Sequence, residues 1–168
     1  MISHDQVFSY NNICVYIYIY IYIYIHIYRV IKITMTKIKF ERIADIYRCA
    51  LRGDWSEMEA IVRNNPDSVR FTVAETGDTA LHVAAGAGNT SFVEELTKLM
   101  KPEDQLIPNF QGMLPVHLAA LSDHHRVVQH FCSQQHLLKK MDSDILDKLF
   151  YMTIGNDMFG KLSFSFIR

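Results

Sequence analysis

The chain has 168 residues, of which 49% are hydrophobic and 21% charged, a balance typical of a globular protein and not of a disordered one. Its 17 Lys and Arg residues nearly cancel its 18 Asp and Glu residues, so no net field attracts nucleic acid. The three cysteines, Cys14, Cys49 and Cys132, lack CxxC spacing, which argues against a disulfide framework and predicts reduced thiols in a cytoplasmic protein.

The first 40 residues form a low-complexity leader. Residues 13–28 read ICVYIYIYIYIYIHIY, in which Ile and Tyr alternate with a period of two. The alternation fits a β-strand of unusual length, and the apolar content fits a membrane span whose basic flank, residues 29–42, would stay in the cytosol. Every residue from 13 to 28 also fits codons that alternate purine and pyrimidine, as in a translated dinucleotide repeat. We favour this third interpretation, which leaves residues 1–40 outside the fold.

The first predicted helix covers residues 42–52, because its apolar residues recur at helical spacing. Gly53 can adopt the left-handed conformation that ends a helix. Asp54 is a good N-cap for a second helix over residues 55–64, which ends before Pro66. This helix pair is the first predicted unit.

The second predicted unit begins with a connecting loop, which we call a finger, over residues 66–78. Thr79 is the expected N-cap of an inner helix over residues 80–86. Gly88 should end that helix in a left-handed conformation, and an outer helix is predicted over residues 90–100.

The third unit repeats this pattern. Pro115 suits the first position of an inner helix that ends near residue 122, and an outer helix is predicted over 124–134. Asp123 stands 35 residues after Gly88, and we expect it to share the positive φ because Asp tolerates that conformation better than most residues. A further helix is predicted over 142–153. The predicted units span 42–75, 76–110 and 111–140, with a partial unit over 141–160 and a tail over 161–168.

Two stretches of sequence repeat at this 35-residue interval. Thr79-Ala80-Leu81-His82-Val83-Ala84-Ala85 corresponds to Leu114-Pro115-Val116-His117-Leu118-Ala119-Ala120, and a fainter copy ends at Ala50. A period of this size is typical of stacked helical units, which bury a core between neighbours and expose an extended surface. The paired alanines are expected to be small because successive inner helices approach closely.

Both stretches resemble the ankyrin signature T-P-L-H-x-A-A, although the second has Leu114 in place of threonine. Gly53-Asp54-Trp55 and the stretches 92–96 and 101–104 further resemble plant ankyrin proteins that carry a C-terminal membrane domain of the PGG type. The resemblance covers residues 42–160 and is most specific over 76–120; the membrane domain has no counterpart here. The resemblance implies an all-α ankyrin-repeat solenoid of helix-turn-helix units with short finger loops. The structural signature residues are Thr79, Leu81, His82, Ala84, Ala85, Gly88, Pro115, His117, Ala119 and Ala120.

The partner surface can be placed only from this resemblance, which implies finger tips and exposed inner-helix ends. An exposed Phe110 would be an aromatic anchor, whereas packing beneath the finger would hide it. The candidate partner-binding residues are Glu75, Thr76, Asp78, Asn109, Phe110 and Gln111.

No motif for catalysis is found. The resemblance gives His82 and His117 a structural hydrogen-bonding role near the start of a helix. The later histidines lack the i, i+4 spacing of a zinc pair, and no phosphate-binding or nucleophile motif occurs. We therefore expect no catalytic residue, no metal and no cofactor.

The expected function is that of a non-catalytic protein-protein interaction module in signalling or scaffolding, with another protein as partner and no nucleic acid. The alternative is a membrane-associated signalling protein, a truncated PGG-type ankyrin protein at the cytosolic face of the plasma membrane. Membrane contact would then depend on the leader or on the absent C-terminal domain.

Overall fold

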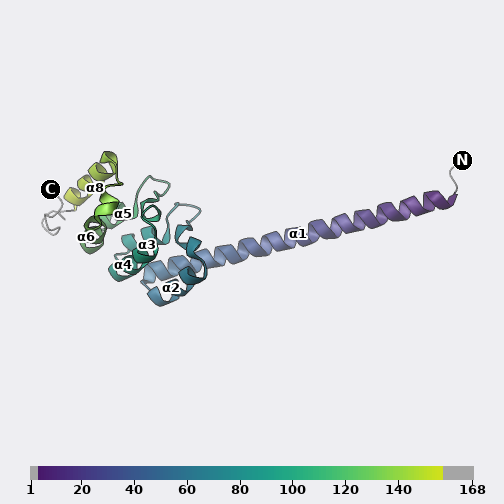
Figure 1. Ribbon diagram of the computed structural model, residues 1–168, viewed down its shortest axis with the longest axis horizontal. Coiled ribbons are helices and arrows are strands. Elements are labelled where there is room, and N and C mark those ends of the chain that lie inside the picture. Colours follow the sequence, from purple (N-terminus) through teal and green to yellow (C-terminus); the bar gives the residue numbers. More distant parts are fainter. Residues whose placement is uncertain (1–3, 157–168) are drawn as a thin grey trace. The chain divides into compact units, whose positions relative to one another are not determined.

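The computed structural model describes the backbone of residues 4–156 and the side chains of residues 20–156 (Figure 1). Every regular element in that part of the chain is helical, apart from one isolated bridge between Thr72 and Thr79. The all-α prediction is therefore confirmed. The chain divides into two units, Met1–Arg42 and Ile43–Arg168, which we describe separately. The predicted tail over 161–168 lies outside the described residues.

The leader is helical and not extended. Helix α1 covers His4–Arg52 without interruption, so the β-strand interpretation is wrong, and the helix predicted from residue 42 begins 38 residues earlier. Ile and Tyr tolerate either conformation, and an isolated strand would leave its backbone hydrogen bonds unmade, whereas a helix makes them within the segment. The dinucleotide origin of the sequence stays a prediction.

Side chains of residues 20–40 are exposed on every side of α1. The exposed fraction is 72% for Tyr20, 50% for Ile23 and 71% for Phe40. Alternating Ile and Tyr advance by about 200° per pair around a helix, so neither residue type collects on one face. Within the described residues, no helix combines the length and hydropathy needed to span a membrane.

Removing the leader should leave stability unchanged, because residues 20–40 bury little surface in this structure. A chain that starts at Lys39 should show the same melting temperature as the full chain and remain soluble at higher concentration. Circular dichroism melts of both proteins test this expectation. A melting temperature lower by several degrees in the shorter chain would show that the leader contributes to the core.

The second unit contains the predicted helix pairs. The end of α1 pairs with α2 (Trp55–Asn64), α3 (Ala80–Gly86) with α4 (Thr90–Leu99), and α5 (Pro115–Leu121) with α6 (His125–Ser133). Short 3-10 turns over Pro66–Arg70 and Asp104–Leu106 lead into the fingers. Helices α7 (Gln135–Leu138) and α8 (Ser143–Gly155) follow, and Asp142 caps α8 through Ile145 N at 2.8 Å.

Inner helices pack in succession, α3 on α5 and α5 on α8, and outer helix α4 packs on α6. Ala84 and Ala85 of α3 and their equivalents Ala119 and Ala120 of α5 are completely buried, as expected for closely approaching helices. Larger side chains fill the space between inner and outer helices. The largest of these buried residues are Phe92, Phe131, Ile46, Met58, Leu81, Leu96 and Leu137.

The turns that end the inner helices have the predicted left-handed backbone. The φ angle is +72° at Gly53, +75° at Gly88 and +58° at Asp123. Beside each turn, a side chain from the following unit bonds to the carbonyl end of the helix. Asn89 Nδ2 donates to Ala50 O at 2.7 Å, and His124 Nε2 lies 3.0 Å from Gly86 O. Asn156 Nδ2 donates in the same way to Ala120 O at 2.5 Å.

Candidate functional site

Two fingers lie against each other at the N-terminal ends of α3 and α5. The backbone N–H of Phe110 donates to Thr76 O at 2.9 Å. Asn109 Nδ2 donates to Asp78 Oδ1 at 2.8 Å, while Asn109 Oδ1 accepts from the N–H groups of Gln111 and Met113 at 3.0 and 2.9 Å. The second finger is thus closed by Asn109 and tied to the first.

Phe110 lies at the tip of this pair of fingers, and 71% of its surface is exposed. Its ring covers Gly77, where an added Cβ would come within 2.6 Å of the Phe110 Cδ1 atom. Gly77 has a φ of +73°, so both its backbone and the neighbouring ring favour glycine. The ring therefore rests on Gly77 on one side and leaves most of its surface in contact with solvent.

The other predicted partner-binding residues differ in accessibility. Glu75, Thr76 and Gln111 are exposed and Asp78 is half-buried, whereas Asn109 is buried with 7% exposure. Asn109 is corrected from a contact residue to a residue that organises the finger, because its side chain is directed at internal donors and acceptors. Asn109 directly follows Pro108, and the sequence carried no distinct signal for this role.

The repeated histidines connect each unit to the next. His82 Nδ1 accepts from Thr79 N at 3.1 Å, and its Nε2 lies 3.0 Å from Met113 O. His117 Nδ1 accepts from Leu114 N at 3.1 Å, and its Nε2 lies 3.2 Å from Ile145 O. Each ring is neutral with its proton on Nε2, because Nδ1 accepts a hydrogen bond from a backbone N–H and so carries no proton itself. These bonds agree with the structural role that the resemblance implies.

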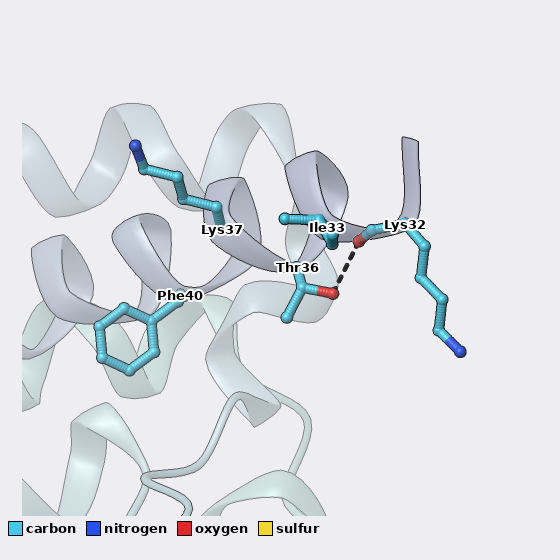
Figure 2. Close-up of a pocket in the computed structure, with 5 residues that line it drawn as sticks. All are labelled: Lys32, Ile33, Thr36, Lys37 and Phe40. Atoms are coloured by element: carbon cyan, nitrogen blue, oxygen red, sulfur yellow. Dashed lines mark hydrogen bonds between the residues drawn. The ribbon is translucent and has the colours of Figure 1, made fainter. Parts of the chain in front are cut away.

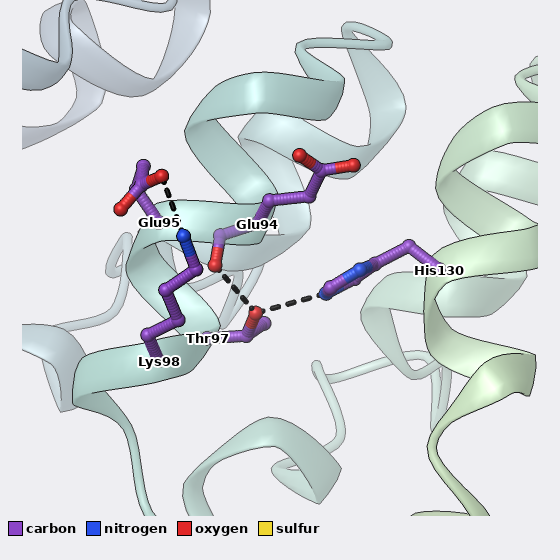
Figure 3. A network of polar contacts seen from close by, with 5 residues as sticks. All are labelled: Glu94, Glu95, Thr97, Lys98 and His130. Atoms are coloured by element: carbon purple, nitrogen blue, oxygen red, sulfur yellow. Dashed lines mark hydrogen bonds and ion pairs between the residues drawn. The ribbon is translucent and has the colours of Figure 1, made fainter.

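A third histidine bridges the outer helices α4 and α6 (Figure 3). His130 Nε2 lies 2.9 Å from Thr97 Oγ1 and 3.1 Å from Gln134 Nε2, and Lys98 pairs with Glu95 at 2.6 Å nearby. Burial lowers the pKa of His130, and nearby Glu94 opposes that shift. The contact between Thr97 and His130 therefore joins outer helices α4 and α6.

Stability should fall in mildly acidic solution. Burial lowers the pKa values of His82 and His117 below the ordinary 6.5 of an unfolded histidine. The unfolded chain therefore binds more protons than the folded chain once the pH falls below about 6.5, and the free energy of unfolding decreases there. Urea titrations between about pH 8 and pH 5 should show a plateau above pH 7 and a decline below 6.5. Imidazole resonances of the folded protein titrating at or above 6.5 would contradict this.

An open groove on α1 is lined by Lys32, Ile33, Thr36, Lys37 and Phe40 (Figure 2). All five residues belong to one helix, and the hydroxyl of Thr36 donates to its own helix at Lys32 O, 2.8 Å away. Among the described residues, no group of three His, Cys, Asp or Glu side chains could hold a metal ion.

Comparisons with known proteins agree with this architecture. A family profile described as ankyrin repeats, in three copies, matches residues 47–144, which is more than half of the chain. The ankyrin repeat-containing protein ITN1 of Arabidopsis thaliana is 37% identical over 73 residues. That match covers 44% of this chain and 12% of the relative, so the chain spans only a small part of the length of this plant protein.

A solved structure shares the fold. The crystal structure of the yeast ribosomal protein Rps3 in complex with its chaperone Yar1 contains a chain that matches with a TM-score of 0.52 and 24% identity, over 56% of this chain and 71% of that one. The likeness concerns the fold alone. Repeats of this kind bind other proteins along their stacked surface. The family match, the 35-residue units and the left-handed turns together show that the chain belongs to the ankyrin-repeat family of protein-interaction modules.

Proposed function

We propose that the chain binds a partner protein through the finger face, which we define as Glu75, Thr76, Asp78, Phe110 and Gln111, and that it acts as a non-catalytic scaffold in cytoplasmic signalling. The observation that carries this proposal is the exposure of Phe110 on a closed pair of fingers. An aromatic side chain has only two rotatable side-chain bonds, so it loses little conformational freedom on binding, which favours it as an energetic centre of an interface.

The proposal is tested by replacing single residues with the photo-crosslinking amino acid p-benzoylphenylalanine in the full chain. A probe at position 110 should capture a discrete protein in cells. The matched control is position 99, because Leu99 is also apolar and 52% exposed but lies at the end of outer helix α4. Equal capture at both positions, or capture at position 99 alone, would contradict binding at the finger face.

A second candidate is membrane association at the cytosolic face of the plasma membrane. It is supported by exposed apolar side chains of α1 beside Lys32 and Lys37. Basic residues near an anionic bilayer surface each contribute about 1 kcal/mol of attraction. Vesicle flotation compares the full chain with the chain that begins at Lys39. Flotation of only the full chain supports this candidate, and failure of both chains to float with anionic vesicles rejects it.

A further inference from the structure

One stripe along helix α1 is apolar without interruption and open to solvent. Its residues stand alternately three and four apart, which is the spacing of the residues that the helices of a coiled coil bury between them. Where the side chains are described, each member of the stripe is 40% to 65% exposed. We call this stripe the seam, and its members in that part of the chain are Ile21, Tyr24, Tyr28, Ile31, Met35 and Ile38.

The residues on either side of the Ile and Tyr repeat select this seam. Inside the repeat nearly every residue is apolar, so a heptad pattern fits there in any of its seven registers. Between residues 29 and 41, a charged residue occupies an inward position in six of these registers, and only the seam avoids them all. These charged residues are Arg29, Lys32, Lys37, Lys39 and Glu41. The polar residues over 4–12 leave the same register, which continues in the sequence through Val7, Tyr10, Cys14 and Ile17. Two stretches of different composition therefore agree on one coiled-coil pattern.

The opposite face of α1 carries cations between residues 29 and 41. Successive residues of an α-helix are about 100° apart, so Ile33 lies about 200° around the helix from Ile31 in the seam. Ile33 belongs to the open groove that also contains Lys32, Lys37 and Phe40 (Figure 2). The exposed fractions of Ile31 and Ile33 are 54% and 68%. The two faces thus expose comparable apolar groups, but only the seam lacks charge.

We propose that the seam of α1 binds the seam of a second copy of this chain, which gives a two-helix coiled coil. A coiled coil requires a partner helix with a matching heptad pattern, and a copy of α1 supplies that pattern along the whole seam. A large apolar side chain that loses half of its surface removes roughly 100 Å² from water. Six such side chains from each copy remove about 1,200 Å², which reaches the range of specific, stable interfaces. This interaction goes beyond the finger face and does not depend on it.

Salt separates this self-association from binding to an anionic bilayer. Two copies of α1 carry like charges beside the seam, because residues 29–41 contain four cations and one carboxylate. Added salt screens the repulsion between the copies, so it should leave the dimer unchanged or stabilise it. Attraction of the same cations to anionic lipid weakens with added salt.

The test is sedimentation equilibrium of the full chain in lipid-free buffer, from about 1 to 100 μM, where dimers of moderate affinity dissociate. The seam variant carries Ile31→Gln and Ile38→Gln, and the matched control carries Ile33→Gln and Phe40→Gln on the groove face. Glutamine preserves helix propensity and adds no charge. The control residues are 68% and 71% exposed, against 54% and 40% for the seam pair, so the control loses at least as much exposed apolar surface.

We expect the wild-type chain to have twice the mass of one chain at the upper concentrations. The dissociation constant should rise at least about tenfold in the seam variant and change less than about twofold in the control. Both variants should melt as the wild-type chain does, because residues 20–40 bury little surface, and equal melting temperatures show that the second unit is intact.

Three results overturn the inference. A wild-type chain that is monomeric at every concentration does so, and flotation with anionic vesicles would then identify the membrane as the ligand of α1. Equal weakening in the two variants does so as well, since association would then depend on total apolar surface and not on the heptad register. Dissociation of the dimer by added salt is the third. None of these results affects capture of a partner by the crosslinker at position 110.

Discussion

Truncating Leu81 to Ala should lower the free energy of unfolding by about 2–5 kcal/mol, the usual cost of removing a buried Leu side chain. Leu81 lies in α3, has no exposed surface and belongs to the core between successive units. Urea unfolding followed by circular dichroism measures the change. A loss below about 0.5 kcal/mol, as at a surface site, would mean that α3 does not pack as described.

Enlarging a buried side chain of an inner helix should also lower the free energy of unfolding. Ala119→Leu adds volume where α5 has completely buried alanines, and overpacking of this kind costs about 1–3 kcal/mol. Ala60→Leu is the matched control, because Ala60 is exposed on α2 and the same atoms are added there at no packing cost. Equal stability of the Ala119→Leu and wild-type proteins would contradict close approach of the inner helices.

Replacing Gly88 by Val should destabilise the protein by about 2–5 kcal/mol, because two costs add. The φ of +75° is strained for a β-branched residue. In addition, a Cβ at this position would come within 2.5 Å of His124 Nδ1. Moving the ring aside would break its hydrogen bond to Gly86 O, so the clash cannot be relieved freely. Thermal and urea unfolding of the variant measure the combined cost.

Asn substitutions separate these two costs. Backbone preference alone predicts that Gly88→Asn is mild, but the contact with His124 removes that tolerance. Gly112 is the control position, because its φ is +67° and no atom lies within 4 Å of an added Cβ. Gly88→Asn should therefore lower the free energy of unfolding clearly more than Gly112→Asn does. In a protein that also carries His124→Ala, the difference between these two losses should be smaller. Equal effects of the two Asn substitutions would show that the His124 contact does not matter.

Most of the second unit could be predicted from local sequence signals. The Asp54 cap, Pro115 at the first helical turn and the 35-residue register of Gly53, Gly88 and Asp123 each reflect chemistry that acts within a few residues. The predicted boundaries of α2, α3, α4, α5, α6 and α8 therefore lie within two residues of those in the structure, whereas the start of α1 and the short helix α7 were not predicted. The family match over residues 47–144 rests on the same repeated signals.

Contacts between units could not be predicted in the same way. The burial of Asn109 depends on Asp78 of another finger, and the constraint on Gly88 depends on a His124 ring 36 residues later. The helical leader was missed for a different reason. An Ile and Tyr alternation matches the period of a strand, yet within residues 4–156 no strand lies beside it to supply hydrogen bonds, and a helix satisfies its own backbone. A two-residue period in the sequence therefore does not by itself produce a β-strand when there is no second strand to pair with.

The central claim is that a partner protein is bound through Phe110 on the finger face. The most direct measurement is calorimetric titration of the protein captured by the crosslinker into the wild-type chain and into the Phe110→Ala and Leu99→Ala variants. Both residues are exposed and apolar, at 71% and 52%, so they differ mainly in location. We predict a loss of about 2 kcal/mol or more for Phe110→Ala and an unchanged affinity for Leu99→Ala. Unchanged affinity in the Phe110→Ala variant would contradict the account.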